Sequence, residues 1–121
     1  MDVFFSYTRE QAIADGVLVD VTEMAKEAGI RYPTAVTRAV WCEYVEVPEK
    51  APWQDESGRL WDILWMMRHA IVSSPEHTDW LRFSLYVQND ESELKEVQLK
   101  SVCGPGDTPE PVITIMLPDE D

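Results

Sequence analysis

The sequence is short of basic residues and has no long apolar run. Its 121 residues contain 10 Lys and Arg against 23 Asp and Glu, which gives a formal net charge of −13. A surface of this charge repels phosphate backbones and anionic lipid headgroups, so direct binding to nucleic acid or to a membrane surface is not expected. No apolar run approaches the roughly 20 residues that a membrane-spanning helix needs.

Cysteine and histidine are also scarce. Cys42, Cys103, His69 and His77 form no CxxC motif and no pair at zinc-like spacing, so we expect no metal site and no cofactor. The stretch Gly104-Pro105-Gly106-Asp107 is not followed by Lys-Ser/Thr, which argues against a phosphate-binding P-loop. The chain does not open with a secretory signal pattern, so a cytoplasmic protein with free thiols is expected.

Helical signals dominate the first 73 residues. Thr8, with Gln11 three residues later, has the pattern of a capping box, and a glycine ends each of two short predicted helices. Residues 17–21 lie between these helices and read as a short strand. A third helix is predicted from Pro33 onward, because apolar residues recur there at four-residue spacing: Val36, Val40 and Tyr44.

The fourth predicted helix, residues 59–73, has the strongest pattern. It is apolar almost all round, which is typical of a helix buried on several sides, so we expect it to be the central helix of the fold. Trp61 and Trp65 lie on a second face of this helix. That face is either part of the core or a surface for a partner.

From residue 81 onward the apolar period changes from 3.6 to 2, which predicts strands at 81–87, 94–103 and 112–117. The last of these is apolar on both faces and should be the best covered. We therefore expect one α+β domain over residues 1–121, in which about four N-terminal helices pack on a C-terminal antiparallel sheet of three or four strands. The acidic tail at 118–121 should be frayed.

Cys103 is the candidate for a nucleophile, with His69 or His77 as its base. A reactive thiol needs nearby positive charge, and no basic cluster surrounds Cys103. Cys103 also shares a strand face with Val97 and Leu99, which favours a buried structural role.

Three stretches of the sequence resemble a known family. They are FFSYTREQAIADGVLVDVTEMAKEAGIRYPTAVTRAVW, GRLWDILWMMRHAI and VCGPGDTPEPVITIMLP. They are similar to an uncharacterised family of small bacterial proteins carried on plasmids, integrative elements and prophages. The resemblance implies a small accessory protein of a mobile element and supplies no catalytic residues.

These observations favour a non-enzymatic protein that acts through a protein–protein surface, as a monomer or homodimer. One form of this hypothesis is an inhibitor of host defence, or a regulator, whose acidic face mimics nucleic acid and binds a basic nucleic-acid-binding protein. The alternative is a small enzyme or small-molecule binder with a site near the loop Cys103–Asp107. The candidate partner surface comprises Glu23, Glu27, Glu43, Glu46, Glu49, Asp55, Glu56, Trp61 and Trp65.

Overall fold

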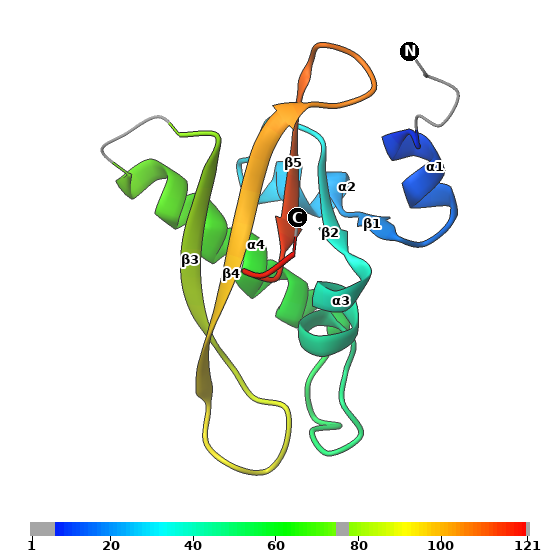
Figure 1. Cartoon of the computed structure of the whole chain (residues 1–121). Coiled ribbons are helices and arrows are strands. Elements are labelled where there is room, and N and C mark those ends of the chain that lie inside the picture. The colour runs from blue at the N-terminus through cyan, green and yellow to red at the C-terminus, as the bar shows by residue number, and fades with distance from the viewer. Residues whose placement is uncertain (1–6, 75–77, 121) are drawn as a thin grey trace.

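The computed structural model describes residues 7–74 and 78–120, and folds them into a mixed sheet with one long helix across a face (Figure 1). The helical elements are α1 (Arg9–Ala14), α2 (Thr22–Glu27), α3 (Arg38–Val40), the π-helical turn η2 (Trp41–Val45) and α4 (Glu56–Ser73). The strands are β1 (Leu18–Asp20), β2 (Thr34–Thr37), β3 (Trp80–Val87), β4 (Lys95–Pro105) and β5 (Pro111–Met116).

The five strands lie in the order β1-β2-β5-β4-β3. β2 runs parallel to β5, and the other neighbouring pairs are antiparallel. The central place of β5 agrees with the apolar residues on both its faces. The α+β class is therefore confirmed, but the predicted separation of N-terminal helices from a purely antiparallel sheet is wrong. The N-terminal half supplies β1 and β2, and only one of its helices is long.

The third predicted helix begins later than expected. Residues Thr34–Thr37 form β2, and the helical segment begins at Arg38, with Thr37 as its N-cap. Three of the four residues of β2 are β-branched, which favours a strand. Val36 has no exposed surface and lies opposite Ile115 of β5. Pairing on both sides within the sheet thus outweighs the helical spacing of the apolar residues.

The predicted capping box at the start of the first helix and the glycines predicted to end the first two helices are confirmed. The Thr8 side chain accepts a hydrogen bond from the Gln11 backbone N–H, and the Gln11 side chain accepts one from Thr8 N–H. Gly16 and Gly29 follow α1 and α2 with φ values of 77° and 93°, which other residues rarely adopt. These turns reverse the chain after each short helix.

Helix α4 packs one side against the sheet. Ile63, Leu64 and Met67 have no exposed surface, and they belong to the same buried cluster as Leu99 and Ile115 of the sheet. The helix begins at Glu56, three residues earlier than predicted, because the Asp55 side chain accepts a hydrogen bond from Gly58 N–H.

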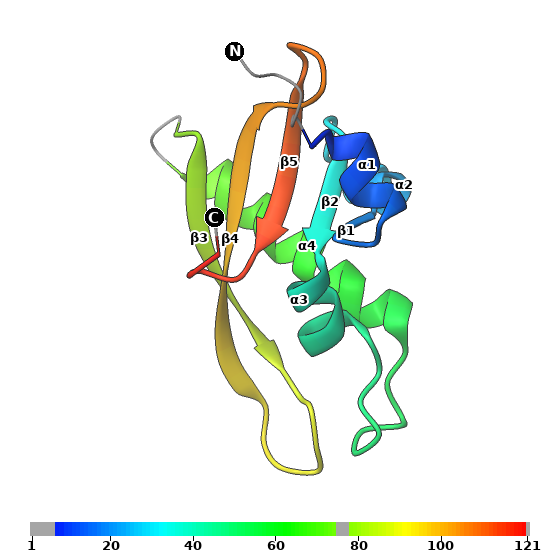
Figure 2. The same ribbon diagram turned by 45° about the vertical axis from the view of Figure 1, so that its right-hand side comes forward.

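The opposite face of the sheet is not crossed by a helix in either view (Figures 1 and 2). The chain after β5 turns back toward this face. The Glu120 carboxylate accepts hydrogen bonds from the Thr37 hydroxyl and from Leu117 N–H, both at 2.8 Å. The Glu120 carbonyl accepts another from Lys100 Nζ at 2.7 Å. Within the tail predicted to be frayed, Glu120 is thus hydrogen-bonded, and Asp121 lies outside the described residues.

Candidate functional site

The loop between β4 and β5 holds the first helix in place. Backbone N–H groups of Arg9 and Glu10 donate to the Asp107 carboxylate at 2.8 and 3.0 Å, so this carboxylate caps α1 from 97 residues away in the chain. The Arg9 side chain then reaches β5, where it donates to Thr114 Oγ1 at 2.7 Å and to the Ile113 carbonyl at 2.8 Å. The loop thus has a structural role that its sequence alone does not reveal.

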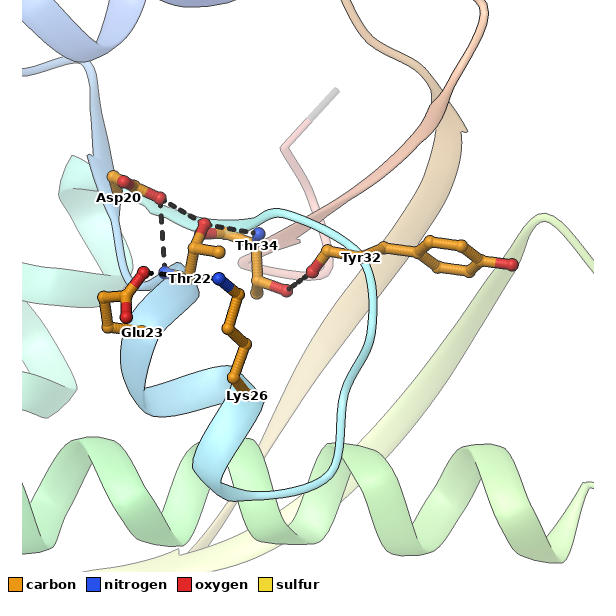
Figure 3. Close-up of polar contacts among 6 residues, drawn as sticks. All are labelled: Asp20, Thr22, Glu23, Lys26, Tyr32 and Thr34. Atoms are coloured by element: carbon orange, nitrogen blue, oxygen red, sulfur yellow. Dashed lines mark hydrogen bonds and ion pairs between the residues drawn. The ribbon is translucent and has the colours of Figure 1, made fainter.

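Helix α2 is attached to β2 by a small polar network (Figure 3). The Asp20 carboxylate accepts hydrogen bonds from the Thr22 backbone N–H and hydroxyl, and the Thr22 hydroxyl accepts one from Thr34 N–H at 3.1 Å. Thr34 is buried and donates through its own hydroxyl to the Tyr32 carbonyl. This network fixes the start of α2 on the sheet.

Two members of the predicted partner surface, Glu23 and Glu27, lie on α2 and are exposed. Glu23 forms an ion pair with Lys26 at 3.5 Å, shown in Figure 3. An exposed pair of this kind contributes little to stability. These two carboxylates are on a different part of the molecule from the remaining predicted ones (Figure 1).

The other five predicted carboxylates gather at one end of the molecule. They lie on η2, on the loop that follows it and at the start of α4, and the loop between β3 and β4 extends beside them (Figure 1). That second loop adds three carboxylates that the sequence pattern did not point to. We call the whole set the acidic end: Glu43, Glu46, Glu49, Asp55, Glu56, Asp90, Glu91 and Glu93.

Arg59 ties the segments of the acidic end together. One of its terminal nitrogens donates to Gln54 Oε1 at 2.8 Å and to the Gln88 carbonyl at 3.0 Å. The other donates to Asn89 Oδ1 at 2.7 Å and to the Glu43 carbonyl at 3.3 Å. Gln54 Nε2 also donates to the Gln88 carbonyl, and Asn89 Nδ2 to the Glu43 carbonyl. A single guanidinium thus joins η2, the following loop, α4 and the end of β3.

Arg59 is 6% exposed, and its hydrogen bonds within the described part of the chain go to neutral oxygens. Burial lowers its pKa, although a guanidinium remains charged at neutral pH. Its Nε has no hydrogen-bond partner among the described residues. The buried positive charge lies beneath the acidic end and partly offsets the repulsion between its carboxylates.

The electrostatics of Asp90 show that the two loops are close together. Hydrogen bonds from the Ser92 hydroxyl and backbone N–H are the main cause of its lowered pKa. The positive charges of Lys95 on β4 and of Lys50 in the loop before α4 lower the pKa further. Lys50 therefore acts on a carboxylate 40 positions away in the sequence, which places both loops at the acidic end.

The remaining two predicted residues, Trp61 and Trp65, lie on α4. Their rings are stacked, with centroids 5.8 Å apart and planes at 14°. Trp65 is 46% exposed, and the Arg68 guanidinium carbon lies 5.6 Å from its ring centroid, a cation–π contact. Trp61 is half-buried and packs against the core cluster. The Trp face is therefore partly core and partly surface.

A cavity lies beside Cys103, where the alternative site was predicted. It has a volume of about 240 Å³ and opens between the end of α4, the start of β3 and β4. Its lining is mostly apolar. The lining residues are Tyr32, Ile71, Ser74, Thr78, Asp79, Trp80, Leu81, Ser101, Cys103 and Ile113.

The chemistry of this cavity does not suit a thiolate nucleophile. Burial raises the pKa of the Cys103 thiol, and the negative charge of Asp79 raises it further, so the thiol is neutral at neutral pH. His69 is exposed on α4 and does not line the cavity, while His77 lies outside the described residues. The geometry fits the binding of a small apolar molecule better than covalent catalysis.

Within residues 7–74 and 78–120, no cluster of His, Cys, Asp and Glu side chains could hold a metal ion. None of the helices in this part of the chain combines the length and the apolar character needed to cross a membrane.

Comparison with curated proteins and with solved structures finds no match. A family model with the description "Family of unknown function (DUF6573)" matches residues 1–121. The predicted resemblance to a family without assigned chemistry is thus confirmed, and its link to mobile elements stays a prediction. Because the match covers the whole chain, the protein belongs to this family of unknown function, DUF6573.

Proposed function

We propose that the protein is a non-enzymatic interaction protein, an accessory factor of a bacterial mobile element that binds a basic partner through its acidic end. One observation supports this most strongly. The Arg59 network holds two loops side by side, so that eight carboxylates from separate stretches of the chain share one end of the fold. The two lysines at this end, Lys50 and Lys95, leave it strongly negative.

The physical basis of such binding is electrostatic. A concentrated negative surface attracts a basic groove over about 8–10 Å at physiological ionic strength and accelerates encounter. A basic nucleic-acid-binding protein offers such a groove, and an acidic surface can compete there with phosphates. Trp65 lies two to three helical turns along α4 from Glu56 and can add an apolar contact beside the charges.

Neutralising the acidic end tests this proposal. A variant with four Glu→Gln changes there should bind its partner about thirtyfold more weakly, since four charges worth about 0.5 kcal/mol each sum to about 2 kcal/mol. The changes are Glu46→Gln, Glu49→Gln, Glu91→Gln and Glu93→Gln. Affinity purification from a bacterial lysate, followed by mass spectrometry and titration of the recovered partner at low and high salt, measures the effect.

A matched control changes the net charge equally at other exposed positions: Glu10→Gln, Glu23→Gln, Glu27→Gln and Glu110→Gln. This control should keep nearly all of the affinity. Equal loss in both variants, or binding that is insensitive to salt, would show that the acidic end is not the contact surface.

The assembly of the acidic end depends on Arg59, so Arg59→Met should loosen it. The substitution leaves the Gln88 and Glu43 carbonyls without their guanidinium donor, and we expect a loss of about 2–4 kcal/mol in the free energy of unfolding. Hydrogen exchange should become faster in the loops at 46–55 and 88–94. Urea denaturation and hydrogen-exchange mass spectrometry measure both effects. Arg31→Met, at an exposed position, is the control, and equal protection in the two variants would contradict the role of Arg59.

The cavity beside Cys103 supports a second candidate function, the binding of a small apolar molecule. Its volume of about 240 Å³ accommodates a ligand of one or two aromatic rings. The neutral thiol of Cys103 and the buried hydroxyl of Ser101 would supply the polar contacts.

A thermal-shift screen with small aromatic fragments tests this candidate. Fragments that enter the cavity should raise the melting temperature of the native protein, because a ligand that binds only the folded state stabilises it. Cys103→Phe fills the cavity and should abolish the shift. Val102→Phe, the neighbouring position on the opposite face of β4, should preserve it. If no fragment shifts the native protein, this candidate is eliminated.

A further inference from the structure

Strand β3 is an outer strand of the sheet, and its outer edge is unpaired (Figure 1). The Cys103 N–H donates to the Asp79 carbonyl at 2.7 Å, which fixes the phase of the ladder between β3 and β4. In an antiparallel ladder, hydrogen-bonded pairs of residues alternate with pairs that are not hydrogen-bonded. The odd-numbered residues of β3 therefore form backbone hydrogen bonds with β4. The backbone N–H and C=O groups of Arg82, Ser84 and Tyr86 therefore point outward, and among the described residues they have no hydrogen-bond partner.

Natural proteins usually protect a long edge strand with proline, charged side chains, a bulge or a covering segment. The sequence WLRFSLYV of β3 contains no proline and a single charged residue, Arg82, and it pairs with β4 without a break in register over all eight residues. The Thr78 hydroxyl donates to the Trp80 carbonyl, which occupies one outward group at the start of the strand. Trp80 and Tyr86 are 55% and 63% exposed on the uncovered face beside this edge.

Among the described residues, the charge on this edge has no complement. Arg82 is the charged residue of β3, and it lies directly opposite Lys100 of β4 on the same face. Like charges in directly opposed positions destabilise a sheet. Lys100 donates to the Glu120 carbonyl, whereas Arg82 is exposed and has no ion-pair partner among the described residues.

We propose that a second copy of the chain pairs antiparallel with this edge, so that β3 of both copies joins their sheets into one. With the two-fold axis at Ser84, Ser84 faces Ser84 of the partner subunit, and Arg82 faces Tyr86 of the partner subunit. Glu96 lies opposite Tyr86 on β4, one strand further on, so Arg82 also approaches Glu96 of the partner subunit. Each arginine then gains a cation–π contact and a carboxylate, which complement a charge that has no ion-pair partner among the described residues of one chain.

Charge disfavours the register centred on Arg82, and hydrogen bonding excludes others. Moving the axis to Arg82 would bring two arginines face to face and add repulsion. The outward backbone groups belong to even-numbered residues, so even-numbered residues must face even-numbered residues of the partner subunit. Every register that places an odd-numbered residue opposite an even-numbered one is therefore excluded. The dimer is argued from the edge of β3 alone, and its test does not depend on the function proposed for the acidic end.

The test is the mass of the full chain in solution, measured by sedimentation equilibrium over a wide concentration range. The native chain should have twice the mass of one chain. Arg82→Glu should be monomeric, with a dimer dissociation constant raised more than about tenfold, because the new carboxylate meets Glu96 of the partner subunit. Its fold should persist, since the carboxylate introduced at this position would lie opposite Lys100 in the same chain.

Two further variants complete the test. Arg31→Glu makes the same change of charge at an exposed position away from β3 and should remain dimeric. Arg82→Glu combined with Glu96→Lys exchanges the charges and should restore the dimer. A native chain that is monomeric at all concentrations would overturn the proposal. A strand of another protein would then be the candidate to pair with the edge of β3. A dimeric Arg82→Glu variant, or a charge-exchanged variant that stays monomeric, would also overturn it.

Discussion

The burial of one side of α4 against the sheet is the contact on which the rest of the molecule depends. Ile63, Leu64 and Met67 are fully covered there, and burial of each such side chain is worth about 1.5–3 kcal/mol. The same helix carries Arg59 near its first turn and Ile71 near its last. Its packing therefore positions both the network beneath the acidic end and one wall of the cavity at the opposite end.

The charge of the chain is distributed unevenly over the surface of the fold. Eight carboxylates share the acidic end, where a buried guanidinium holds the loops together without neutralising the surface. The outer edge of β3 has the opposite character, since its charged side chain is an arginine and its neighbours are aromatic. One end thus suits a basic partner, and the edge suits pairing with a strand.

Local signals in the sequence were sufficient for much of the fold. The capping box at Thr8, the glycines after α1 and α2, and the alternation in β3 and β4 all depend on near neighbours in the chain, and the structure agrees with them. Strand β2 was missed because its apolar residues continue a helical stripe. The β-branched residues between Pro33 and the N-cap Thr37 were the signal that could have revealed it.

The candidate site was harder to predict from the sequence than the fold. The sequence named seven acidic residues as candidates without showing whether they share a face, and in the fold Glu23 and Glu27 lie on α2, away from the other five. The carboxylates at 90–93 lie between two predicted strands, and only the fold places them beside the loop before α4. Arg59 was missed because its partners are carbonyl and amide oxygens from distant segments, and no sequence pattern marks such acceptors.

The most direct test of the central claim is the hydrogen-exchange footprint of the protein bound to its recovered partner. If the acidic end is the contact surface, backbone amides at 43–57 and 88–94 should be protected together, while those of α2 should exchange at the same rate as in the free protein. Protection confined to α2, or to the residues around the Cys103 cavity, would contradict the account.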